Sequence, residues 1–150
     1  MRLLGTIRKT KTKGRTMFII TVPDLDVVTQ GYSIVEAHEM IKDAIETLAD
    51  EKGFEVDVFP SEEDGMFYIS SNNTSSLLRL LIQRQRQMEE VTLALAAKKM
   101  GSTSPNAYAQ YEQKEGRQPS VETFERLMKS LSPNKELVIQ IIDVPEKKRA

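Results

Sequence analysis

The chain has 150 residues, of which 39% are hydrophobic and 29% charged, enough for one moderate core or two small ones. Cysteine is absent, which excludes disulfide bonds and thiolate metal sites and is typical of a reducing compartment. No apolar run approaches the roughly 20 residues that span a bilayer, and the basic N-terminal residues lack the apolar stretch of a signal peptide. We therefore expect a soluble, cytoplasmic protein with no membrane contact.

Charge is distributed unevenly, although the net charge is only −1. Residues 1–15 carry +6, residues 16–75 carry −11, and residues 76–150 carry +4. An acidic middle beside a mildly basic C-terminal half predicts two surfaces with different partners, a basic protein and a polyanion.

The first half of the chain has the pattern of a small antiparallel sheet with one helix. β-Branched and aromatic residues predict strands over 3–7 and 16–22, joined by a basic hairpin loop over 8–15, and a third strand over 27–29. The lysines of that loop are able to touch phosphate, although a basic loop tip is usually only solvated. Two further strands are expected over 54–58 and 66–69. The S-x-x-E signature at Ser33 and Glu36 precedes an apolar stripe of helical spacing, which predicts a helix ending near Gly53.

The outer face of this predicted helix is acidic. Four acids recur along it at spacings of three or four, namely Glu39, Asp43, Glu46 and Asp50. They predict a continuous acidic ridge, either a docking face for a basic partner or a solvated face. Asp24 and Asp26 lie in the turn after the second predicted strand and join this candidate partner-binding set. His38, the only histidine, has no evident partner and is interpreted as a surface or boundary residue.

The composition changes abruptly at SSNNTSS, which predicts a linker over 71–76 between a domain of residues 1–70 and a domain of residues 77–150. Ser76 is expected to cap a leucine-rich helix that packs beneath the second domain, with Arg84 and Arg86 near its solvent end.

The stretch from Thr92 to Ser120 predicts two short helices that meet at a tight turn, a helix-turn-helix candidate. Thr92 caps the first helix and Gly101 ends it, while Ser104 and Pro105 begin the second. The expected buried stripe of the first helix is Leu93, Ala96, Ala97 and Met100. The alternative is an ordinary helix hairpin at the surface.

The polar side of the second helix has the chemistry of a recognition helix. Asn106 and Gln110 stand four residues apart, and both residue types can hydrogen-bond bidentately to adenine in the major groove. The candidate DNA contacts are Lys98, Ser102, Thr103, Ser104, Asn106, Gln110, Lys114 and Arg117.

Near the C-terminus, Pro119 and Ser120 are expected to start one more helix, ending before Pro133. The apolar run ELVIQIID over residues 136–143 then predicts a strand. Because a lone strand must pair with something, its pairing with the same segment of a second chain predicts a dimer.

Two segments of the chain resemble known families. The run VPDLDVVTQGYSIVEAHEMIKDAIE looks like the N-terminal domain of HicB antitoxins, and AAKKMGSTSPNAYAQYEQKEGRQPS is similar to the helix-turn-helix of phage repressors that many of these antitoxins carry. The resemblance implies an α+β fold, with a partial ribonuclease-H-like sheet and helix followed by an all-α helix-turn-helix module. It also implies an antitoxin that neutralises a small, basic, HicA-like mRNA-cleaving ribonuclease and represses their operon as a dimer or tetramer on palindromic DNA. The basic segment KTKTKGR departs from this family, whose first loop is usually acidic or glycine-rich.

Two other classes of function compete with this interpretation. A stand-alone dimeric repressor that senses a ligand through its first domain explains the second half of the chain equally well. An enzyme is the third class, but metal-dependent phosphodiester cleavage needs converging carboxylates, and the acids here lie along one helix face or in turns. We therefore expect no catalytic residue, no metal site and no cofactor.

Overall fold

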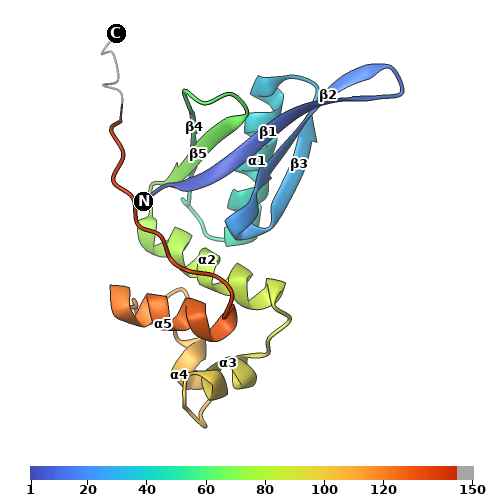
Figure 1. The fold of residues 1–150 in the computed structure, drawn as a ribbon. Helices are drawn as coiled ribbons and strands as arrows, with labels where there is room; N and C mark the ends of the chain where they lie inside the picture. Colours follow the sequence, from blue (N-terminus) through green and yellow to red (C-terminus); the bar gives the residue numbers. More distant parts are fainter. Residues whose placement is uncertain (145–150) are drawn as a thin grey trace.

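The computed structural model describes residues 1–144 as a mixed α+β protein (Figure 1). The strands are β1 (Leu3–Thr12), β2 (Arg15–Val22), β3 (Val27–Gly31), β4 (Val56–Pro60) and β5 (Met66–Ser71). The helices are α1 (Ile34–Ala49), α2 (Thr74–Met88), α3 (Leu93–Lys99), α4 (Asn106–Ala109) and α5 (Val121–Leu131), and a 3-10 turn, η1 (Pro23–Leu25), joins β2 to β3.

The strands form one antiparallel sheet, as the strand pattern predicts, and their order in it is β3-β2-β1-β5-β4. The predicted hairpin loop over 8–15 is wrong, because β1 and β2 continue until Thr12 pairs with Arg15. The turn is reduced to Lys13 and Gly14, which have φ angles of 50° and 78°. Two successive residues with positive φ suit a tight hairpin turn, and the alternating threonines of KTKT favour a strand over a loop.

Helix α1 covers one face of the sheet (Figure 1). Its start follows the predicted capping box, since the Ser33 hydroxyl accepts from the Glu36 N–H at 3.1 Å and the Glu36 carboxylate accepts from the Tyr32 N–H at 2.6 Å. A Cβ on Gly31 would lie 2.4 Å from the Ala37 nitrogen, so the close approach of β3 to α1 requires glycine there. The core side chains of α1 and the sheet are fully buried, among them Ile20, Val22, Ala37, Ile41, Ile45, Phe67 and Ile69.

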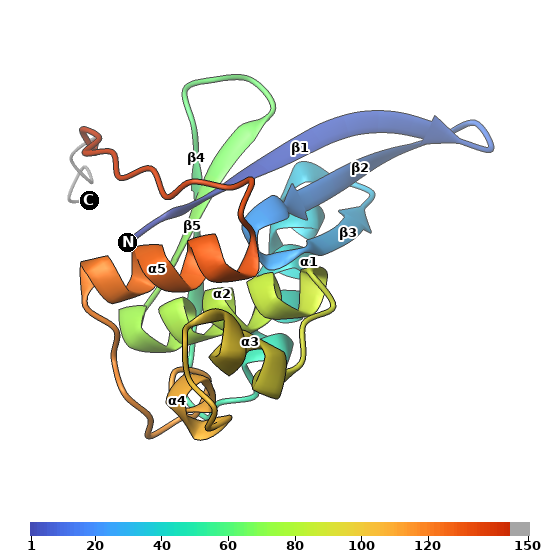
Figure 2. The same ribbon diagram turned by 60° about the horizontal axis from the view of Figure 1, so that its bottom comes forward.

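Helix α2 lies between the sheet, with α1 on it, and the group of helices α3, α4 and α5 (Figures 1 and 2). It begins earlier than predicted, because the side chain of Asn73, not Ser76, accepts the capping hydrogen bond, from the Ser76 N–H at 3.1 Å. Ser76 lies inside the helix and is only 3% exposed. Residues 71–76, the expected linker, thus comprise the last residue of β5, the cap of α2 and its first turn.

The chain after α2 packs its helices against one another and against α2. Ser120 caps α5 as predicted, accepting from the Thr123 N–H at 3.2 Å, and α5 buries Phe124, Leu127 and Leu131. One continuous hydrophobic core extends from Leu3 in β1 to Leu131 in α5. Every helix within residues 1–144 falls short of the length and apolarity needed to cross a membrane.

The predicted terminal strand over 136–143 is wrong for the single chain, because these residues have no regular secondary structure. Val138, Ile139 and Ile141 are 82%, 70% and 97% exposed. A strand needs a neighbour for its backbone groups, and within residues 1–144 no strand pairs with this segment. Pairing with a second chain stays a prediction.

Candidate functional site

Helix α3 has the capping that the sequence predicts, but α4 is shorter than predicted and lacks its expected cap. Thr92 Oγ1 accepts from the Leu95 N–H at 3.1 Å, and Gly101 ends the helix with a φ of 85°. Ala96 and Ala97 are buried, whereas Leu93, expected in the buried stripe, is 39% exposed. Helix α4 is a single turn, Asn106–Ala109, and the expected cap at Ser104 makes no side-chain capping bond. One turn of helix presents few side chains, so any base reading here depends on the loop before it as much as on α4 itself.

Some of the predicted DNA-contacting side chains are exposed to solvent, and others are hydrogen-bonded within the protein. Thr103, Ser104 and Asn106 are exposed at the start of α4, Ser102 is half-buried beside them, and Lys98 is exposed on α3. Gln110 is one of the hydrogen-bonded residues, because its amide donates to the Ala107 carbonyl at 3.1 Å and its side chain is half-buried.

The last two predicted DNA contacts lie after α4. Lys114 donates through Nζ to the backbone carbonyl of Asp50, at the end of α1. Arg117 is exposed, and its backbone N–H closes a loop onto the Gln110 carbonyl at 3.0 Å. The structure therefore connects Lys114 with the sheet-bearing half of the chain and leaves Arg117 on the surface.

A partly buried ion pair fixes the segment after α4 to α2. Arg86, expected near solvent, donates to Glu112 from Nε at 2.6 Å and from Nη2 at 3.0 Å, and its Nη1 donates to the Val91 carbonyl at 2.8 Å. The hydrogen bond to Glu112 raises the pKa of Arg86. Tyr108 of α4 lies fully buried, and burial raises the pKa of its hydroxyl. The buried Tyr108 and the Arg86–Glu112 pair thus fix α4 and the segment after it to the rest of the protein.

The acidic face of α1 is present, but its four acids differ in their surroundings. Glu39 and Asp43 are exposed and take part in no ion pair within residues 1–144. Glu46 accepts from the Val56 N–H at 2.8 Å and lies 3.8 Å from Lys42 Nζ. Asp50 is the left-handed residue that ends α1, with a φ of 45°. Glu39 and Asp43 are therefore available to a partner, Glu46 also holds the start of β4, and Asp50 contributes to the end of α1 through its backbone.

Asp24 and Asp26 occupy a different place, the η1 turn, which α2 holds. Arg84, also expected near solvent, donates through Nε to the Leu25 carbonyl at 2.7 Å and lies 3.5 Å from the Asp26 carboxylate. Gln85 donates to the Asp24 carbonyl at 2.8 Å. Burial raises the pKa of Asp24, against the opposing effect of Lys135. The η1 turn is thus held in place by α2. Its two acids are not part of the acidic face of α1.

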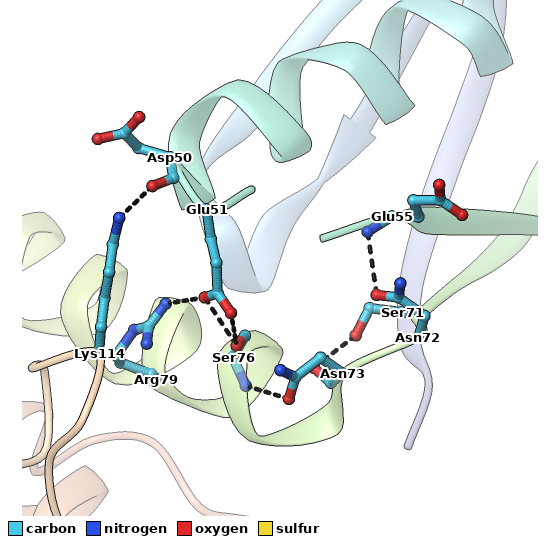
Figure 3. A network of polar contacts seen from close by, with 9 residues as sticks. All are labelled: Asp50, Glu51, Glu55, Ser71, Asn72, Asn73, Ser76, Arg79 and Lys114. Atoms are coloured by element: carbon cyan, nitrogen blue, oxygen red, sulfur yellow. Dashed lines mark hydrogen bonds and ion pairs between the residues drawn. The ribbon is translucent and has the colours of Figure 1, made fainter. Parts of the chain in front are cut away.

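A polar network joins α1, α2 and the chain after α4 (Figure 3). The sequence pattern does not predict it. The Glu51 carboxylate accepts from Ser76 Oγ at 2.8 and 3.0 Å and from Arg79 Nη2 at 2.6 Å, and these bonds lower its pKa. Beside it, the Asn72 side chain accepts from the Glu55 N–H at 3.0 Å and donates to the Gly53 carbonyl at 2.8 Å. The only sequence signal is the polar composition of SSNNTSS, which was interpreted as a linker.

An open hollow of about 550 Å³ lies beside the edge strand β3. Its lining combines the apolar side chains of Met17, Ile19, Val28, Tyr32 and Met40 with the polar residues Thr29, Gln30 and Glu36. Val28 and Tyr32 are 61% and 49% exposed. His38 lies elsewhere, with its ring 5.6 Å from that of Phe67, and burial lowers its pKa. Within residues 1–144, no group of histidines and acids could hold a metal ion.

The fold and these surfaces define a class, an α+β protein whose antiparallel sheet carries an acidic helix on one face and a group of short helices at one end. Comparison of the sequence with protein-family models and with curated proteins gave no match.

Proposed function

We propose that the chain is a HicB-type antitoxin with two activities. The sheet-bearing half binds and neutralises a small basic ribonuclease of the HicA kind, and the α3–α4 region of the helical half binds operator DNA as a helix-turn-helix. The protein acts in the cytoplasm and itself carries out no catalysis. Binding of a palindromic operator requires at least a dimer, because one short helix contacts too few bases for useful specificity.

The separation of the two surfaces is the observation that carries this proposal. Helix α1, which carries the exposed Glu39 and Asp43, lies beside the sheet, whereas α4, which begins at Asn106, lies beyond α2 (Figure 1). Two partners of opposite charge can then bind one chain without competing for the same face.

The charge of α1 suits a partner that binds RNA. Such a partner must present a positive surface to its substrate, so an acidic helix speeds the encounter and covers the surface that RNA would use. Met40 of α1, which directly follows Glu39 in the sequence, is 42% exposed, so some apolar contact area adjoins the acids. Neutralisation then needs no chemistry, only competition for the basic surface.

The test is co-expression of the full chain with the product of the adjacent open reading frame, which the proposal requires to be a small basic protein. We expect the two to purify together, the ribonuclease activity to be lost in the complex, and the mass to give the stoichiometry. The full chain is required because a piece ending at residue 70 would lose Ser76, Arg84 and Gln85, which hold Glu51 and the η1 turn. A neighbouring protein that remains separate and active in the presence of the folded chain would refute the proposal.

The hollow beside β3 favours a second candidate function, a stand-alone repressor that senses an apolar small molecule. Its volume of about 550 Å³ is within the range of ligand pockets. A fluorescent apolar probe that binds there and alters DNA affinity, in a chain that binds no ribonuclease, would favour this candidate.

A further inference from the structure

The β1–β2 hairpin extends beyond the strands on either side of it (Figure 1). Pairing of β1 with β5 stops at Thr6 and Met66, and pairing of β2 with β3 stops at Phe18 and Gly31. Residues 10–17 therefore pair only with one another, as a two-stranded ribbon. Residues 8–15, which the sequence predicts to be a loop, therefore form part of a regular hairpin that projects from the sheet.

The ribbon and the end of β1 that leads into it carry only positive charge. The cations are all exposed, namely Arg8 and Lys9 at the base of the ribbon and Lys11, Lys13 and Arg15 within it. No acid occurs before Asp24 in the sequence, and none of the five takes part in an ion pair within the described part of the chain. A positive potential is therefore concentrated on a narrow ribbon attached to an acidic body.

The register places these charges on both faces of the ribbon. Residues directly opposite each other in an antiparallel pair share a face, so Lys9 and Lys11 lie on the face of their partners Phe18 and Thr16. Arg8 and Arg15 lie on the other face, where the Arg15 guanidinium stacks 3.7 Å from the centre of the Tyr32 ring. Lys9 and Lys11 are two residues apart, so their side chains leave the strand roughly 7 Å from each other.

Protection of exposed strand edges does not account for this pattern. Lysine on an edge strand hinders unwanted pairing, but mixed charges do so equally well and repel each other less. No cation of the hairpin lies directly opposite another, because Lys9, Lys11 and Arg15 pair with Phe18, Thr16 and Thr12, so the hairpin holds its positive charge without a repelling cross-strand pair.

We propose that residues 8–15 form a DNA-binding arm that contacts the phosphates of B-form duplex DNA. The major groove of B-form DNA admits a two-stranded β-ribbon, whereas the major groove of A-form RNA is too deep and narrow for side chains to read. The contact depends on neither the ribonuclease partner nor base reading by α4, so it goes beyond the function proposed above.

The test is fluorescence anisotropy with a labelled non-operator duplex of about 21 base pairs, two turns of helix. The full chain is compared with the triple variant Lys9→Gln, Lys11→Gln, Lys13→Gln over about 50 to 200 mM salt. Each lost phosphate contact should reduce the slope of log affinity against log salt by about 0.9, so the triple variant should lose about two to three units of slope. The matched control, Lys42→Gln, Lys52→Gln, Lys129→Gln, removes the same charge elsewhere and should retain the slope.

The substitutions are at exposed positions, and circular dichroism checks that both variants keep their fold. An equal slope for the two triple variants would overturn the proposal. So would a ribbon-dependent preference for duplex RNA, or a change in oligomeric mass without a change in DNA affinity, which would mean that the arm binds the acidic helix of a second copy. Because the duplex contains no operator, failure of operator recognition or of ribonuclease binding leaves this result unaffected.

Discussion

The guanidinium of Arg86 and the carboxylate of Glu112 form a two-pronged ion pair between α2 and the chain after α4, with hydrogen bonds of 2.6 and 3.0 Å. The side chains are only 15% and 9% exposed. The pair thus holds the segment that follows the proposed DNA-contacting helix α4 against α2, which also contacts the sheet.

Removing one member of this pair should be costly. Glu112→Ala leaves the Arg86 charge partly buried without its partner, and we expect a loss of about 3 kcal/mol in the free energy of unfolding. The double variant Arg86→Met, Glu112→Leu removes both charges and should lose less. Urea denaturation measures both, and a loss below about 1 kcal/mol for Glu112→Ala would mean that the pair behaves like an exposed one.

Tyr108→Phe should be close to neutral. The Tyr108 hydroxyl is buried and has no hydrogen-bond partner among the described residues, so removing it relieves an unpaired polar group. We expect the free energy of unfolding to stay within about 1 kcal/mol of the wild type or to rise, whereas Tyr108→Ala should cost about 3 to 5 kcal/mol. A large loss on Tyr108→Phe in thermal denaturation would show that the hydroxyl makes a stabilising bond.

The Glu51 network should make stability depend on acid pH. The hydrogen bonds from Arg79 and Ser76 lower the pKa of Glu51 below its ordinary value of 4.5. Its contribution is therefore complete above pH 4.5 and is lost as the pH falls through the lowered pKa. Unfolding free energy measured from about pH 6 to pH 3 should fall less steeply for Glu51→Gln than for the wild type. Identical profiles for the two proteins would contradict the role of the network, and Glu62→Gln serves as the exposed control.

In DNA binding, Asn106 should matter more than Gln110. Asn106 is exposed at the first position of α4, whereas the Gln110 amide is half-buried and bonded to the Ala107 carbonyl. Asn106→Ala should weaken operator binding by roughly 1 to 3 kcal/mol for a lost base contact, with non-specific binding unchanged, and Gln110→Ala should have the smaller effect. Titration of operator and non-operator duplexes measures both, and the reverse ranking would place the reading helix in a different orientation.

The local patterns of the sheet-bearing half were predictable from sequence. The capping box at Ser33 and Glu36 and the alternating strands depend on neighbours a few residues apart, and the structure confirms them. The hairpin arm is not predictable in this way, because hydrophilic lysines are typical of loops as well as of exposed strands, and Lys13 and Gly14 alone suffice for the turn.

The candidate sites were less predictable because they depend on distant contacts. The pairing of Arg86 with Glu112 spans 26 residues and that of Arg79 with Glu51 spans 28, and no periodicity signals either. Arg84 was expected at the surface because its contact, the Leu25 carbonyl, is a backbone atom that sequence does not mark. For the same reason SSNNTSS was interpreted as a linker rather than as a cap and a hydrogen-bonded corner.

The central claim, that the acidic face of α1 binds a basic ribonuclease, is tested most directly by stopped-flow association kinetics. The full chain is mixed with the purified product of the adjacent open reading frame, which the account requires to be a small basic protein. The variant Glu39→Lys, Asp43→Lys is compared with the control Glu62→Lys, Glu63→Lys, which makes the same charge change in the β4–β5 loop. We predict association of the α1 variant to be at least about tenfold slower at low salt, with the difference shrinking as salt screens the charges. Equal association rates for the two variants at every salt concentration would contradict the claim.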